Sequence, residues 1–298
     1  MIEILEKIAK ASHIVVISNQ DLSIDSLASA SVIYTFLLQN HKKTSWFCKN
    51  QNLDKRVLVI PWSDSIKSSF PISADLAISL GCEDSRAFGV ELLCEVINID
   101  HHSSNTLYGD LNFVYIESRS TTEILYNFFK ANNLKINKKI ATALYAGVLD
   151  SSEAFLSSSI DGTTFAIAKE LIENGADFRL CNENIIKRVS LAALRLRAIM
   201  FKNMLLKESA RVALFCVSHK DMLSSGATFK DCENPLRESL NLESVEISVL
   251  LSQKSDLSIE ASIYSKKEYT SKVVFKIEDI TSLKEAQEKI LILIKKDL

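Results

Sequence analysis

Short runs of β-branched and apolar residues alternate with segments of helical periodicity through the first 185 residues, and this alternation constrains the fold more than any other feature. The helical segments include residues 26–40, 138–149 and 163–174. The strand-like runs are HIVVIS (13–18), TSWFC (44–48), VLVI (57–60), DLAISL (75–80) and VINI (96–99). Strands that alternate with helices predict an α/β fold with a mostly parallel sheet and helices on both faces.

The period of the apolar pattern changes after residue 206. Residues 185–206 read as one long amphipathic helix, and the segments beyond it are short strands, RVALFCVS, VEISVLLS, SIEASIY and KVVF, followed by a charged helix over 282–296. We therefore predict an α/β domain over 1–185, a connecting helix over 186–207 and a smaller α+β domain over 208–298. We expect the two domains to lie across a cleft.

Composition excludes several classes of protein. The 35 basic and 37 acidic side chains give a net charge of −2, which argues against a protein whose main role is to grip nucleic-acid backbones. No run approaches the roughly 18 apolar residues of a membrane span, and the acidic start does not fit a signal peptide, so we expect no membrane association and a cytoplasmic protein. The six cysteines form no Cys-x-x-Cys pair, and the seven glycines form no phosphate-binding motif.

The string Asp100-His101-His102 follows the VINI strand directly, at the edge of the predicted sheet where ligands of such folds bind. A carboxylate and imidazoles together can ligate a divalent metal that activates water for phosphoester hydrolysis. The alternative is structural, with the carboxylate accepting from backbone amides and the histidines packing in the loop. Three residues alone leave both interpretations open.

A longer context carries a resemblance. The triplet continues as DHHSSNTLYGDLNFVYIESRSTTEIL, which resembles the third motif of the DHH phosphoesterase family, while SHIVVISNQDLSIDSLASASVIY and IATALYAGVLDSSEAF are similar to the first and fourth motifs. The segments after ARVALF resemble the DHH-associated C-terminal domain of the branch that degrades short oligonucleotides and cyclic dinucleotides. The resemblance covers the whole chain and implies a two-manganese site on the larger lobe and a nucleotide-holding face on the smaller.

The aligned positions depart from the family's metal-binding pattern. Asn19 stands where the family has its motif-one His, Ser23 where it has an Asp, Gly81 where an Asp bridges the two metals, and Ser151 where the fourth motif has an Asp. The resemblance keeps Asp25 and His101, and Asp150 lies beside Ser151. We expect His101 and Asp25 to hold at most one weakly bound ion, because hydroxyl and amide oxygens are weaker ligands than carboxylates for hard cations. The loop carboxylates Asp21, Glu83 and Asp84 offer a less favoured way to rebuild the site.

The C-terminal part departs in the same direction. Family members carry a Gly-Gly-Gly-His segment near their end, but the last glycine here is Gly226. The family's phosphate-holding arginine aligns with Tyr264. The substrate lobe therefore lacks the same kind of residues as the metal lobe.

Two functions follow. In the first, the protein has lost two-metal catalysis and binds a nucleotide, a nucleic acid or a protein partner, with no cofactor. In the second, it is a manganese-dependent phosphodiesterase or exonuclease that acts on short oligonucleotides or cyclic dinucleotides through Asp25, His101 and Asp150. Whether it is an enzyme stays open, and a homodimer is compatible with either function.

Five residues are candidates for ligand binding or loop architecture. Arg119, Ser120 and Thr121 precede and begin a predicted helix, so they either hold an anion or form an ordinary helix cap. We expect Asp100 and His102 to tie the loop to the sheet, and replacing Asp100 with Ala to lower stability. For Asp25, which loses its metal partners, we expect little change or a slight gain from the same replacement.

Overall fold

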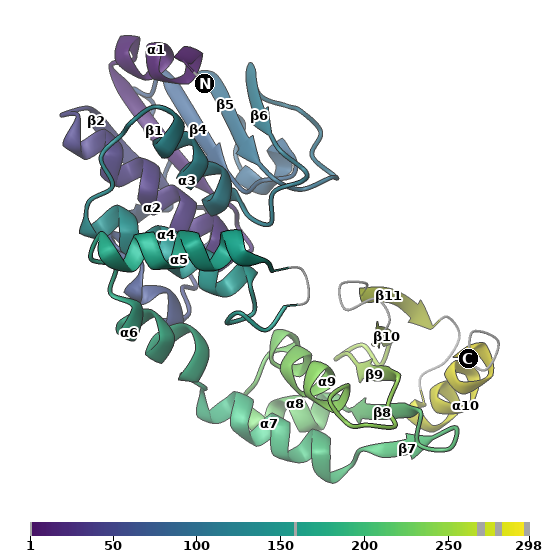
Figure 1. Cartoon of the computed structure of the whole chain (residues 1–298). Helices are drawn as coiled ribbons and strands as arrows, with labels where there is room; N and C mark the ends of the chain where they lie inside the picture. The colour runs from purple at the N-terminus through teal and green to yellow at the C-terminus, as the bar shows by residue number, and fades with distance from the viewer. Residues whose placement is uncertain (1, 158–159, 267–271, 278–281, 295–298) are drawn as a thin grey trace. The chain divides into compact units, whose positions relative to one another are not determined.

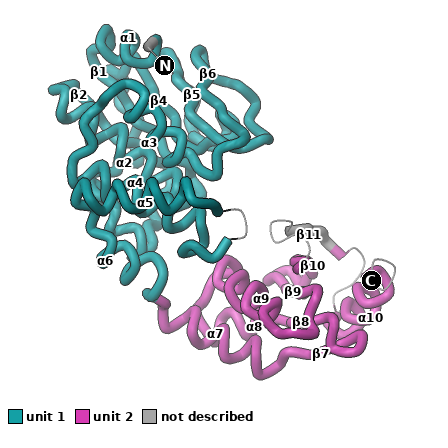
Figure 2. Tube along the Cα trace, in the orientation of Figure 1, with its two compact units in different colours: residues 1–188 teal, residues 189–298 magenta. Residues whose placement is uncertain are grey.

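The computed structural model describes residues 2–157, 160–266, 272–277 and 282–294. The chain separates into two compact units, Met1–Arg188 and Val189–Leu298 (Figure 2). Each unit has its own sheet and its own buried core, as expected for domains that bury separate apolar faces. The predicted fold class, an α/β unit plus a smaller α+β unit, is confirmed.

A six-stranded parallel sheet forms the centre of the first unit, in the order β3-β2-β1-β4-β5-β6 (Figure 1). Its central strands read as continuous apolar runs because both faces are covered, and every residue of β1 and β4 is buried. The strands are β1 (His13–Ser18), β2 (Lys43–Phe47), β3 (Ile66–Lys67), β4 (Leu76–Leu80), β5 (Glu95–Asp100) and β6 (Leu111–Val114).

In the described part of this unit the α-helices are α1 (Ile2–Lys10), α2 (Ile24–Gln39), α3 (Thr121–Ala131), α4 (Lys138–Ser151), α5 (Gly162–Glu173) and α6 (Phe178–Cys181). The expected helices on two faces are unevenly distributed. Helices α1 to α5 pack in the cluster that contains Ile14 and Val16 of β1. The opposite cluster, around Val15 and Ile17, is closed by coil and by the 3-10 helix η3 (Ser85–Phe88).

Two sequence expectations are wrong, one within this unit and one where it meets the second. The VLVI run does not form a strand but lies in the 3-10 helix η1 (Lys55–Val59), because the Asp54 side chain accepts from the Arg56 amide and caps a tight turn there. The single helix over 185–206 is broken: a π-helical turn over Asn182–Lys187 ends at Arg188, whose backbone is extended. Ser190 then caps α7 (Leu191–Lys202).

The second unit contains a mixed sheet in the order β11-β10-β9-β8-β7. Strands β8 and β9 are parallel, and the other neighbours are antiparallel. After α7, the elements are β7 (Leu205–Lys207), β8 (Val212–Val217), α8 (His219–Ser225), α9 (Glu233–Ser239), β9 (Ile247–Gln253), β10 (Ile259–Ser265), β11 (Lys272–Ile277) and α10 (Leu283–Ile294). Short 3-10 turns also lie at Ser63–Ser65 in the first unit and Phe229–Cys232 in the second.

Across the described ranges, no helix has the length and apolar character needed to cross a membrane.

Candidate functional site

Three loops meet where β1, β4 and β5 end. The parallel register places Ser18 beside Leu80, and Leu80 beside Ile99, so the residues that follow these strands share one edge of the sheet. Asn19 therefore meets Gly81, whose amide donates to the Ile99 carbonyl at 3.0 Å, two residues before His101. This is the edge at which parallel α/β sheets bind ligands.

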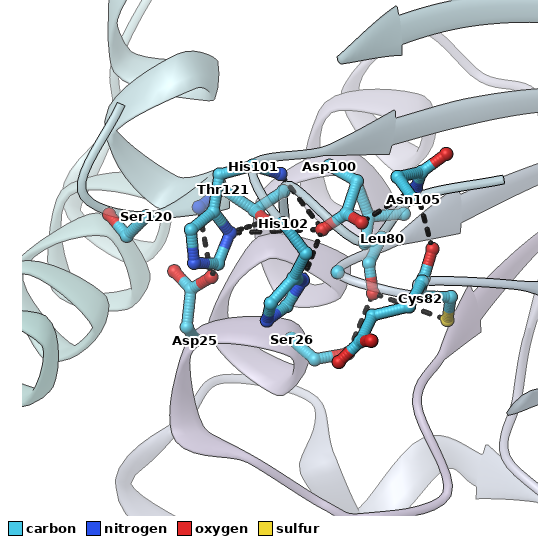
Figure 3. Close-up of polar contacts among 12 residues, drawn as sticks. Asp25, Ser26, Leu80, Cys82, Asp100, His101, His102, Asn105, Ser120 and Thr121 are labelled. Atoms are coloured by element: carbon cyan, nitrogen blue, oxygen red, sulfur yellow. Dashed lines mark hydrogen bonds and ion pairs between the residues drawn. The ribbon is translucent and has the colours of Figure 1, made fainter. Parts of the chain in front are cut away.

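Asp100 ends β5 with a fully buried carboxylate that ties its own loop together. One oxygen accepts from the His101 amide at 2.8 Å and from Nδ1 of His102 at 2.7 Å, and the other accepts from Nδ2 of Asn105 at 2.6 Å (Figure 3). Burial alone raises the pKa of Asp100, but these hydrogen bonds outweigh it and hold the pKa below its ordinary value. The sequence expectation that Asp100 accepts from its loop is confirmed by these contacts.

The two histidines differ in their electrostatic surroundings. The hydrogen bond that His102 donates to the Asp100 carboxylate raises the pKa of His102 against the opposing effect of burial. Burial lowers the pKa of His101, although the nearby Asp25 carboxylate opposes this shift at 3.8 Å. Nδ1 of His101 lies 3.0 Å from Oγ1 of Thr121, and the two imidazole rings lie 4.2 Å apart. His102 is thus fixed by an acid, and His101 by the start of α3.

Asp25 lies in the first turn of α2 and accepts from the first turn of α3. Its carboxylate receives the Thr121 amide at 2.9 Å, the Thr122 amide at 3.0 Å and the Thr122 hydroxyl at 2.8 Å. A carboxylate at a helix N-terminus satisfies amides that have no partner within the helix and faces the positive end of the helix dipole. The expectation that Asp25 has little to stabilise is therefore wrong.

At two other positions where the resemblance places metal ligands, Asn19 and Ser23, the residues make hydrogen bonds that hold the backbone in place. The Asn19 side chain donates from Nδ2 to the Gly81 carbonyl at 3.1 Å, and the Asn19 backbone amide donates to Oγ of Ser26 at 2.8 Å. Ser26 in turn donates to the Leu80 carbonyl at 2.7 Å, which joins β1, β4 and α2. Ser23 caps α2 by accepting from the Ser26 amide.

Gly81 has a left-handed backbone with φ of 63°. A Cβ atom there would lie 3.2 Å from Cβ of Ser26, which is closer than most side chains tolerate. A left-handed conformation also disfavours a side chain at this position. Any larger residue at 81 would have to displace Ser26 from its contact with the strand ends.

Arg119, Ser120 and Thr121 form a helix cap. Ser120 is the N-cap of α3 and accepts from the Glu123 amide, so the cap alternative from the sequence is confirmed. Arg119 pairs with Glu123 at 3.2 Å and with Asp161 at 3.0 Å. Because Asp25 takes the Thr121 and Thr122 amides and Ser120 takes the third, an anion would have to displace a carboxylate to bind at this helix end.

The remaining carboxylates are not part of the closest group of ligand atoms, although the charge of Glu83 acts to raise the pKa of both His101 and His102. Among the described residues, the cluster of three or more ligand-type side chains consists of Asp100, His101 and His102, with ligand atoms within 4.8 Å of one another. Asp150 and Ser151 close the last turn of α4, where the Ser151 hydroxyl donates to the carbonyl three residues earlier. The loop carboxylates of the sequence analysis are engaged locally: Asp21 with the Ser23 amide, Glu83 with the Ser104 hydroxyl and Asp84 with Arg86.

In the second unit, Tyr264 is buried in β10 with the Arg237 guanidinium 5.7 Å from its ring centre. Gly226 ends α8 in a left-handed conformation. Neither position offers the arginine or the glycine-rich backbone that the resemblance implies for a substrate-holding face.

Sequence reasoning missed three residues that organise this site: Ser26, Asn105 and Thr122. Asn105 donates to Asp100 and to the Cys82 carbonyl at 3.0 Å, and so holds the loop after β5 against the loop after β4. Thr122 is 97 residues from Asp25 in the chain. Ser23 gave a local signal for one of these residues. Because Ser is a preferred N-cap, it predicts a helix start that places Ser26 in the first turn.

Comparison with known proteins shows which family the first unit resembles. Residues 13–148 match the model of the DHH family, N-terminal domain. A probable bifunctional oligoribonuclease and PAP phosphatase NrnA of Streptococcus mutans is 40% identical over 83 residues, which is 28% of this chain and 27% of that protein. The NrnA of Bacillus subtilis is 29% identical over 138 residues, 45% of this chain and 43% of that protein. The matched segments thus span less than half of these relatives.

The fold of the whole chain also has a counterpart among solved structures. An exopolyphosphatase-related protein from Bacteroides fragilis superposes with a TM-score of 0.85 over 99% of this chain and 95% of that one. The sequence identity is 18%, so the likeness concerns the fold.

Proposed function

Because residues 13–148 of this chain belong to the DHH family, we propose that the protein is a non-catalytic member of these phosphoesterases that binds a nucleotide or a short oligonucleotide. One observation carries the proposal: both oxygens of Asp25, a ligand position by the resemblance, accept hydrogen bonds from the start of α3. In this arrangement the carboxylate stabilises a helix without needing a metal.

The residues at the strand ends do not fit a two-metal centre. DHH proteins usually use divalent metal ions, and a pair of hard cations at about 3.5–4 Å needs a bridging carboxylate. Gly81 supplies no side chain at the bridging position, and the side-chain amide of Asn19 donates a hydrogen bond to the Gly81 carbonyl. Asn19, Ser23 and Ser151 offer only neutral oxygen or nitrogen atoms. At most one weakly held ion is compatible with His101 and its neighbours.

The nucleotide part of the proposal is supported by the relatives. Two of them are named as enzymes of oligoribonucleotides and of PAP. A protein that keeps this sheet edge but lacks the metal-binding carboxylates retains a surface for recognition rather than for hydrolysis.

A second candidate is a manganese-dependent phosphodiesterase with a reduced site. The observation in its favour is the close Asp100, His101 and His102 cluster. In that case Asp25, His101 and Asp150 would hold one ion.

Product release from a two-nucleotide RNA, a cyclic dinucleotide and 3′-phosphoadenosine 5′-phosphate, with and without manganese, separates the two functions. We expect binding of the dinucleotide by calorimetry and no turnover above that of a His101→Ala variant. Metal analysis after dialysis should find fewer than two ions per chain. Manganese-dependent turnover that disappears in both Asp25→Asn and His101→Ala would establish the second candidate and refute the first.

A further inference from the structure

An apolar groove of about 470 Å³ lies between the end of α4 and the outer face of α5, away from the Asp100 cluster. Its walls carry Tyr145 of α4, Phe155 of the turn that follows, and Phe165, Ala168, Lys169, Ile172 and Glu173 of α5. The strand-end site does not use these residues, although Tyr145 and Phe155 belong to the segment that resembles the fourth motif. The groove is nevertheless joined to that site, because α4 ends at Ser151 and Asp161, the cap of α5, pairs with Arg119.

The groove presents a flat aromatic surface. Phe155 and Phe165 stack with ring centres 5.4 Å apart and an angle of 22° between their planes. Every other ring pair among the described residues is tilted or edge-on, which is the usual geometry of a packed core. Phe165 is 53% exposed, whereas the neighbouring Tyr145 is buried. Phe165 is therefore the ring of the stack that a ligand can reach, and buried residues lie behind it.

The backbone conformation that places Phe155 here is unfavourable. Glu153, Ala154 and Phe155 all have left-handed backbones, with φ of 49°, 59° and 66°. Such conformations cost about 1 kcal/mol or more for each residue with a side chain. The turn is fixed by the Ala154 amide, which donates to the Leu149 carbonyl at 2.8 Å, and by the Phe155 amide, which donates to the Ser152 hydroxyl at 3.1 Å. Phe155 is thus held against Phe165 rather than free to turn away.

We propose that this groove binds the nucleobase of a nucleotide or short oligonucleotide by stacking on Phe165, an inference that rests on the proposed function. Bases stack on aromatic side chains without regard to sequence. The volume suits one small ligand and not a helix of a partner protein. Lys169 and Glu173, paired at 3.6 Å and largely exposed, stand at the rim. An ammonium there can meet a phosphate, and a carboxylate can accept from an exocyclic amine of the base.

Fluorescence titration with 2-aminopurine riboside 5′-monophosphate tests this assignment, because stacking quenches the probe. We expect saturable quenching by the wild-type chain, displacement by AMP and no displacement by ribose 5-phosphate. Phe165→Leu should weaken binding by about 10-fold or more, since loss of a stacking ring has effects of that order. Phe165→Tyr, which keeps the ring, should bind like the wild type. The matched control is Leu156→Ala, an exposed apolar residue of the same turn that does not line the groove.

The outcomes are distinguishable. If the wild-type chain binds a dinucleotide and Phe165→Leu binds the probe equally well, the groove assignment fails and the proposed function stands. If the wild-type chain binds no nucleotide, both fail. If Phe165→Leu instead changes the oligomeric state in sedimentation, the groove is a contact between copies of this chain and the assignment is overturned.

Discussion

Removing the Asp25 carboxylate should destabilise the protein in the absence of any metal. Asp25→Ala leaves the Thr121 and Thr122 amides and the Thr122 hydroxyl without their acceptor, and both threonines are fully buried. Each unsatisfied buried donor costs about 1–3 kcal/mol, and the lost charge at a helix N-terminus adds about 0.3–1 kcal/mol. Because such contributions are not additive and water can enter the gap, we expect a loss of about 3 kcal/mol. For a unit of this size that corresponds to a fall in Tm of about 6–12 °C.

The assay is thermal unfolding by circular dichroism in chelator, with Asp21→Ala as the control. Asp21 belongs to the same loop, but its carboxylate is exposed and accepts from the Ser23 amide at 2.9 Å. Its replacement should change stability by about 0.5 kcal/mol or less. If Asp25→Ala were no less stable than Asp21→Ala in chelator, the helix-capping account would be refuted. A loss seen only with added manganese would make Asp25 a metal ligand instead.

Three further predictions concern the neighbouring loops. Asp100→Ala should lower the free energy of unfolding in urea by about 2–4 kcal/mol, because three donors lose their acceptor; a change below that of Asp21→Ala would contradict it. The loss of stability in His102→Gln should be greatest between the ordinary pKa values of 3.8 for Asp100 and 6.5 for His102. Below this range the ion pair is lost as the pH falls through the lowered pKa of Asp100 in the folded protein. Above it the ion pair is lost as the pH rises through the raised pKa of His102 in the folded protein. A difference in Tm that does not vary from pH 4 to pH 9 would exclude this ion pair. Ala154→Gly should raise stability by about 1 kcal/mol, since glycine adopts the left-handed backbone at φ of 59° without strain, and a lower Tm would show that the methyl group makes a compensating contact.

The sequence predicts the central sheet better than its edges. The runs of β1, β4 and β5 are apolar on both faces because helices and coil cover them, and that burial is visible as continuous hydrophobicity. The edge strands β3 and β6 have two and four residues, which is too short for a periodic pattern to stand out. VLVI has the same composition as a strand, but the Asp54 cap turns it into a 3-10 helix, so a local hydrogen bond decides against propensity.

The candidate site divides in the same way between local and distant contacts. The role of Asp100 could be predicted because its three partners lie within the next five residues of the chain. The role of Asp25 could not, because its partners lie 96 and 97 residues away and are brought to it only when α3 packs against α2. The resemblance implies that metal ligands are missing, but it does not say which atoms take their place.

The structure supplies those atoms, and they explain how the strand ends hold together with fewer charges. A bound cation would draw the loops after β1, β4 and β5 toward one point; here the Asn19 amide bonds the Gly81 carbonyl, and Ser26 joins the first loop to the end of β4. These are bonds between neutral groups, so they incur a smaller desolvation cost than unpaired carboxylates at the same edge would. Asp25 is the exception, and its charge faces the N-terminus of α3. A carboxylate at position 25 therefore has a purpose that does not depend on a metal, and its presence alone is not evidence for catalysis.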